Sequence, residues 1–96
     1  MDVLLHITAA DSLPMALPLA RALTRRGAAW GCFLTNDGVR VLDDDAFAEA
    51  LGQSARAAVC EHSWDHHMAG HDCPVERGSQ TLNSALMGEA ARVVSL

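Results

Sequence analysis

The sequence predicts a single domain of the α/β class, with a small, mainly parallel sheet covered by helices on both faces. The chain has 96 residues, half of them hydrophobic, which suits one folded domain and excludes a second. Short apolar runs alternate along it with segments whose apolar residues recur every three or four positions. Each short run is apolar throughout, as strands of a parallel sheet are when both faces are buried.

The chain opens with a predicted buried strand over Val3–Ile7, and a small polar loop follows. Apolar residues then recur at spacings of three and four over 13–23, which predicts an amphipathic helix. Asp11 or Ser12 is suited to cap the start of this helix, and Gly27 to end it.

Two prolines bear on where this helix begins. Pro14 suits the first turn, where its missing N–H is not needed. Pro18 would cost about 3 kcal/mol in a helix interior. We therefore expect the regular part of the helix to begin near Pro18.

The middle of the chain predicts a second strand and a second helix. Residues 29–34 form an apolar run, and the turn-forming residues 35–38 close it, with Gly38 expected to allow a positive φ. The acids at 43–45 suit a helix start, and the apolar face that follows them ends at Gly52.

The last part of the chain predicts two more strands and one more helix. The third strand covers 56–60, and the segment 61–77 after it is polar and rich in histidine, so we expect a long loop there. A final helix follows, capped by Ser79, and 92–96 forms the closing strand.

This arrangement brings three loops together. Right-handed crossovers place every loop that follows a strand at one edge of a parallel sheet, where ligands usually bind. The loops are 8–12, 35–38 and the segment from Cys60 onward. The topology predicts the place of a site without naming its chemistry.

Charge and composition exclude several classes of function. Twelve acidic residues against seven basic ones give a net charge of -5, so nucleic acid and anionic membranes are poor partners. No apolar run approaches the roughly 20 residues that cross a bilayer, and the start lacks the basic residues of a secretory signal. We expect a cytoplasmic protein whose three cysteines are free thiols.

The order of these features resembles the DsrE/DsrF/TusD sulfur-relay family over nearly the whole chain. The similar segments are ARALTRRG at 20–27, FLTNDGV at 33–39, Val59-Cys60 at the end of the third strand, and ARVV at 91–94. The resemblance implies a flavodoxin-like three-layer sandwich that assembles as a homo-oligomer, a trimer or hexamer. It also implies that Cys60 carries sulfane sulfur as a persulfide between donor and acceptor proteins, with no cofactor and no bound metal.

The residues around Cys60 fit such a role in part. A cysteine that leaves a strand into a helix start gains unpaired N–H groups and a helix dipole, which lower a thiol pKa from about 8.5. His62 would favour the thiolate if its ring turned toward the sulfur, whereas Glu61 would oppose it. The alternative is that Cys60 is a small buried hydrophobe.

Two other functions stay open at this point. The first is a metal-binding or redox-sensing module in the loop 60–73, because imidazole and thiolate are zinc ligands and two cysteines could pair. Its candidate residues are Cys60, His62, His66, His67, His71 and Cys73. The loop has neither a Cys-x-x-Cys nor a His-Glu-x-x-His spacing, which counts against a metal. The second is a non-catalytic structural subunit of the same family.

The remaining candidates have structural explanations. Cys32 and His6 lie within apolar runs, so we expect core positions for both. The turn at 35–38 lacks the glycine pattern of a phosphate-binding loop. Trp64 and Met68 would either contact a partner or cover the core.

Overall fold

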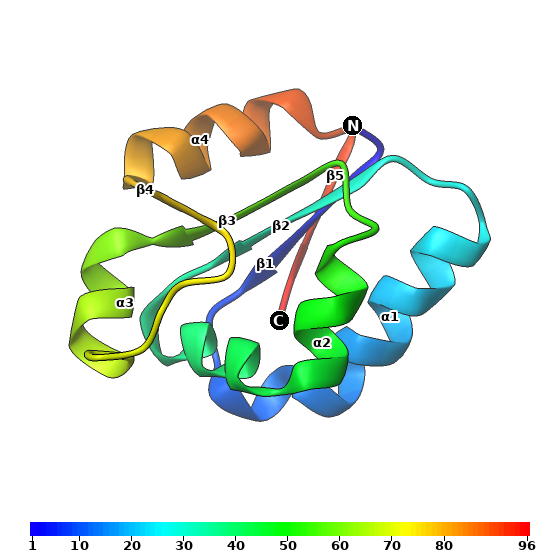
Figure 1. Ribbon diagram of the computed structural model, residues 1–96. Helices are drawn as coiled ribbons and strands as arrows, with labels where there is room; N and C mark the ends of the chain where they lie inside the picture. The colour runs from blue at the N-terminus through cyan, green and yellow to red at the C-terminus, as the bar shows by residue number, and fades with distance from the viewer.

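The computed structural model describes residues 1–96 as a three-layer α/β sandwich around a five-stranded sheet (Figure 1). All strand pairs are parallel, and the strand order is β4-β3-β2-β1-β5. The strands are β1 Val3–Ile7, β2 Trp30–Leu34, β3 Arg56–Cys60, β4 Glu76–Gly78 and β5 Arg92–Ser95. The helices are α1 Leu13–Arg25, α2 Asp45–Leu51, α3 Glu61–His67 and α4 Gln80–Glu89, with 3-10 helices η1 Ala10–Ser12 and η2 Asn36–Asp43. The prediction of a flavodoxin-like α/β sandwich is confirmed.

The two faces of the sheet are covered unequally. α1 and α2 pack on one face, and α4 alone lies across the other (Figure 1). Alternate strand residues enter two separate cores: Leu5 and Cys32 belong to the larger one, and Leu4 and Phe33 to the smaller one under α4. Because both faces are buried, the central strands are apolar except for His6 of β1 and the exposed Arg56 at the start of β3.

The first helix begins earlier than predicted. α1 is helical from Leu13, with Pro14 in its first turn and Pro18 inside it. Pro18 cannot donate to the carbonyl of Pro14 four residues before it, but both prolines are exposed, so water can reach that carbonyl. The expectation of a start near Pro18 was therefore wrong.

The predicted helix ends are confirmed in four cases, one of which is Gly52 at the C-cap of α2, and wrong in one. Gly27 adopts a φ of 70° directly after the C-cap of α1, Asp44 caps α2 through the Phe47 N–H, and Ser79 caps α4. At the start of α1, however, Ser12 makes no capping bond and donates instead to the Ala9 carbonyl.

The turn after β2 has a different geometry from the one predicted. The positive φ belongs to Asn36, at 54°, and Gly38 has an ordinary backbone. Glycine is required at 38 for space, because a Cβ there would lie 2.6 Å from the carbonyl oxygen of Ile7. Residues 36–43 then continue as η2.

The segment 61–77 is not the long loop that was expected. Its first seven residues form α3, which buries Ser63 and Trp64 while His62 and Asp65 remain exposed. β4 then pairs with β3 at the edge of the sheet. Polar residues dominate both elements because one is a short surface helix and the other an edge strand, and this composition hid their periodicity.

Candidate functional site

The structure brings together the three predicted loops at the carboxyl edge of the sheet. Asp37 Oδ1 accepts a hydrogen bond of 3.3 Å from the Ala10 N–H, which joins the loops after β1 and β2. Ser63 Oγ accepts one of 2.9 Å from the Asn36 N–H, which joins the loop after β2 to α3. Cys60 lies at this edge, as the last residue of β3 and the N-cap residue of α3.

Cys60 is more enclosed than a freely reachable thiol. The residue is 6% exposed and packs in the smaller core with Phe33 and Leu86. On its other side lie polar groups of α3 and α4, since the side chains of Ser63 and Gln80 are among the groups that lower the pKa of Cys60. The sulfur therefore sits at a boundary between aliphatic packing and a polar cluster.

That polar cluster is a hydrogen-bonded chain of four side chains. Asn83 Nδ2 donates to Gln80 Oε1 at 3.1 Å, and Gln80 Nε2 donates to Thr35 Oγ1 at 3.3 Å. The hydroxyls of Thr35 and Ser63 are 3.3 Å apart. All four of these residues were absent from the sequence-based candidates: Thr35, Ser63, Gln80 and Asn83. The available signal was Asn83, a polar residue three positions before Leu86 on the buried face of the last helix.

The environment lowers the pKa of Cys60. Burial acts in the opposite direction and raises this pKa, but hydrogen bonds outweigh it. The donors are the side chains of Ser63 and Gln80 and the backbone N–H groups of His62 and Ser63. The sulfur makes no close capping hydrogen bond to α3, so these groups act as surrounding donors to the anion.

The other two cysteines have environments that favour the thiol. Cys32 is fully buried in the larger core, and burial raises its pKa far above the ordinary range. Burial also raises the pKa of Cys73, whose Sγ donates to the Val75 carbonyl at 3.3 Å. All three cysteines are free, so the structure contains no Cys60–Cys73 disulfide.

The histidines of 61–73 do not form a cluster with these thiols. His66 and His67 are neighbours in an edge-to-face arrangement with ring centroids 4.6 Å apart, and His62 and His71 are exposed. No three His, Cys, Asp or Glu side chains come together anywhere in the chain as a metal site requires. The metal-binding alternative gains no geometric support from this arrangement.

The remaining sequence candidates occupy structural positions. Trp64 and Met68 are both buried and cover the larger core. His6 is half-buried and stacks on Phe33 with centroids 6.5 Å apart, and burial lowers its pKa. His6 Nε2 is buried without a hydrogen-bond partner.

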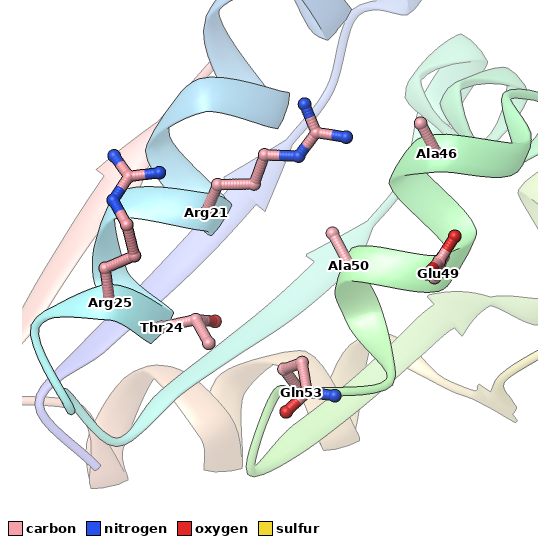
Figure 2. Close-up of a pocket in the computed structure, with 7 residues that line it drawn as sticks. All are labelled: Arg21, Thr24, Arg25, Ala46, Glu49, Ala50 and Gln53. Carbon is pink, nitrogen blue, oxygen red and sulfur yellow. The ribbon is translucent and has the colours of Figure 1, made fainter.

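The hollow of the surface lies elsewhere, between α1 and α2 (Figure 2). It has a volume of about 300 Å³. Its lining residues are Arg21, Thr24, Arg25, Ala46, Glu49, Ala50 and Gln53. Arg25 and Gln53 precede β2 and β3, so the hollow lies toward the amino ends of these strands, away from Cys60. Its lining includes no nucleophile. It combines basic groups with the carboxylate of Glu49, and this negative charge opposes the binding of an anion.

Comparisons with known proteins do not assign the chain to a class. No family model matches the sequence, and no curated protein matches it either. In the structure, no helix is long and apolar enough to span a membrane. The chemistry around Cys60 is therefore the feature of this chain that points to a function.

Proposed function

We propose that this protein is a DsrE-like sulfur carrier that holds sulfane sulfur as a persulfide on Cys60. The observation that carries the proposal is the position of Cys60 at the end of β3, where donors from two further elements, α3 and α4, surround its sulfur. These donors stabilise a thiolate, and the thiolate is the form of cysteine that attacks sulfur. Cys32 and Cys73 lack this environment.

The transfer consists of two displacement steps without net oxidation or reduction. The Cys60 thiolate attacks the outer sulfur of a donor persulfide, so a bond forms between Sγ and that sulfur while the donor leaves as a thiolate. An acceptor thiolate then attacks the same outer sulfur, and Cys60 leaves as a thiolate. The proton of the outer sulfur travels with it or exchanges with water. Donor and acceptor are proteins in this proposal, because the chain has no small-molecule pocket beside Cys60.

Access to Cys60 requires local movement. With 6% of the residue exposed, a donor sulfur reaches Sγ only when neighbouring side chains shift. The side chain of Gln80, which acts on the sulfur, is itself exposed, so its rotation displaces little packed surface. Docking of a donor protein at the carboxyl edge of the sheet would drive this opening.

The proposal includes a homo-oligomer, a trimer or hexamer, working in the cytoplasm. α4 alone buries Leu4, Phe33 and Ala58 on its face of the sheet, whereas two helices, α1 and α2, pack on the other face. On the edge strand β5, Val93 is 41% exposed. Free thiols persist in the reducing cytoplasm, which agrees with three unpaired cysteines. Light scattering of the purified protein tests the assembly, and a monomer at all concentrations contradicts it.

The test of sulfur transfer uses a persulfide donor of low molecular weight and mass spectrometry of the intact protein and its peptides. We expect the wild-type chain to gain one sulfur on the peptide that contains Cys60. Cys60→Ser should gain none, and Cys73→Ser, the matched control, should gain as much as the wild type. Equal gain in Cys60→Ser would overturn the proposal.

A further inference from the structure

The direction in which the four side chains beside Cys60 donate hydrogen bonds can be assigned by counting their donors and acceptors. Ser63 Oγ accepts the Asn36 N–H at 2.9 Å, and Thr35 Oγ1 accepts Gln80 Nε2 at 3.3 Å. Each hydroxyl has one proton left to donate, and the two oxygens are 3.3 Å apart. If Thr35 donates to Ser63, the Ser63 oxygen has two donors and its own proton is free for a third group.

Cys60 Sγ is the acceptor available to that proton. Cys60 is the N-cap residue of α3 and Ser63 the third residue of that helix, so their side chains are neighbours at the helix start. The Ser63 hydroxyl and the Gln80 amide both lower the pKa of Cys60, and the amide has a second N–H besides the one given to Thr35. The reverse orientation, with Ser63 donating to Thr35, would turn the Ser63 proton away from the sulfur.

We infer that the chain Asn83–Gln80–Thr35–Ser63 donates in one direction and ends on the sulfur of Cys60. Thr35 is then a positioning residue: without being a donor to the sulfur, it fixes the Ser63 hydroxyl and holds the Gln80 amide over the site. The inference rests on the proposed function for its purpose, which is to keep the sulfur-carrying thiolate ready in a buried place.

The Asn83 end of this hydrogen-bonded chain agrees with donation toward Cys60. Asn83 Oδ1 is buried and has no hydrogen-bond partner, although the residue is only 7% exposed. A chain that donates toward Cys60 must begin with a residue that gives a hydrogen bond and receives none, and Asn83 is such a residue. An unpaired buried acceptor destabilises the fold, so we expect it to be retained for a reason.

The chain also joins separate layers of the fold. Thr35 follows β2, Ser63 lies in α3, and Gln80 and Asn83 lie in α4 on the other face of the sheet (Figure 1). Gln80 is exposed while Thr35 and Ser63 are buried, so Gln80 is the member that a docking protein can move. Moving it would open the sulfur and withdraw one donor at the same time.

Few charged groups compete with these dipoles. The titratable groups on the elements around Cys60 are Cys32 of β2, Asp37, Arg40 and Asp43 of η2, Arg56 of β3, Glu61, His62, Asp65, His66 and His67 of α3, Glu76 and Arg77 of β4, His6 of β1, and Glu89 at the far end of α4. Glu76 and Arg77 are occupied in ion pairs with Arg56 and Asp65. No charge on these groups is among the causes of the Cys60 pKa shift, in which hydrogen bonds, one of them from the backbone N–H of His62, outweigh burial.

The test measures the pH dependence of Cys60 alkylation by iodoacetamide, followed by peptide mass spectrometry. We expect Ser63→Ala and Thr35→Val to move the midpoint for Cys60 to higher pH and to slow alkylation at neutral pH severalfold. Thr35→Ser, which restores the hydroxyl, should return the midpoint to that of wild type. Thr81→Val, at an exposed position of α4, is the matched control and should change nothing.

The hydrogen-bonded chain also predicts how the effects of two substitutions combine. Residues in one hydrogen-bonded network are not additive, so Ser63→Ala with Thr35→Val should shift the midpoint by less than the sum of the single shifts. If Thr35→Val does not fold, Gln80→Met at an exposed position replaces it, and we expect a shift in the same direction. The inference fails if the folded Thr35→Val or Gln80→Met profile coincides with that of wild type, or if Thr35→Ser shifts as far as Thr35→Val.

Failure of the proposed function gives a different result. If the midpoints move as expected but the wild-type protein gains no sulfur from a persulfide donor, the hydrogen-bonded chain stands and the carrier function falls. If sulfur is gained on Cys60 but the midpoints do not move, the carrier function stands and the chain falls.

Discussion

Cys32 and Cys60 lie on neighbouring strands and are both buried, yet they have opposite electrostatic environments. Cys32 is in the middle of β2 and faces the larger core, where burial alone acts and raises its pKa. Cys60 ends β3 and faces the smaller core, where donors from α3 and α4 outweigh burial and lower its pKa. The difference shows that the end of a strand, with its neighbouring loops, decides the chemistry of a buried thiol more than its depth does.

The largest expected effect is on the relative reactivity of the three cysteines. At neutral pH we expect iodoacetamide to label Cys60 at least ten times faster than Cys32, because Cys32 is both protonated and fully buried. Cys73, which is half-buried with a raised pKa, should be intermediate. Peptide mass spectrometry over a time course measures all three in one sample. Labelling of Cys32 before Cys60 would remove the basis of the comparison.

The same two cysteines should differ in their contributions to stability. Cys32→Ser places a hydroxyl among apolar side chains and should lower the free energy of unfolding by about 1 to 3 kcal/mol. Cys60→Ser keeps its polar neighbours Ser63 and Gln80 as partners, so we expect a loss below about 1 kcal/mol. Urea unfolding followed by circular dichroism measures both. The comparison weakens if Cys60→Ser is the more destabilised variant.

The two thiols should contribute to the pH dependence of the free energy of unfolding with opposite signs. The folded pKa of Cys32 is raised above its ordinary value of 9.0, so the unfolded chain loses its proton first and stability falls as the pH rises above that value. The folded pKa of Cys60 is lowered, so its contribution is complete above 9.0 and is lost as the pH falls through the folded pKa.

The measurement is the free energy of unfolding between neutral pH and about pH 10 in a Cys73→Ser background, which removes a third thiol with a raised pKa. Stability should fall at alkaline pH with Cys32 present and fall less in Cys32→Ala. Identical alkaline slopes in both proteins would show that Cys32 ionises normally.

The smallest effect is expected from removing an ion pair that joins β3, the strand that ends at Cys60, to β4. Arg56 Nη2 of β3 and Glu76 Oε2 of β4 are 2.9 Å apart, and the two side chains are 42% and 47% exposed. Exposed pairs contribute about 0 to 1 kcal/mol and are screened by salt. Arg56→Ala should therefore change stability by less than about 1 kcal/mol and leave the alkylation midpoint of Cys60 in place. A shift of that midpoint would mean that charges, and not only dipoles, hold the thiolate.

Much of the fold was predictable from the sequence because burial on both faces leaves a clear signal. The strands at 3–7 and 56–60 were placed correctly since each is a short, mostly apolar run with polar loops beside it, and His6 and Arg56 are its exceptions. β4 was missed because an edge strand of Glu76–Gly78 carries no such run. α3 was missed because a seven-residue helix rich in histidine shows little periodicity.

The candidate site was predictable in place but not in composition. Topology alone indicated that the loop after β2 and the segment after Cys60 would meet, and Ser63 now joins them. The role of Gln80 could not be read from the sequence, because it depends on how the start of α4 lies over the far face of the sheet. The enclosure of Cys60 is likewise a property of packing between Phe33 and Leu86.

The most direct measurement of the central claim is a two-stage transfer experiment on the purified protein. After treatment with a persulfide donor and removal of excess donor, the account predicts one added sulfur on the Cys60 peptide, and its loss when an acceptor thiol is supplied. A protein whose Cys60 is alkylated rapidly yet never retains a sulfur atom would contradict it.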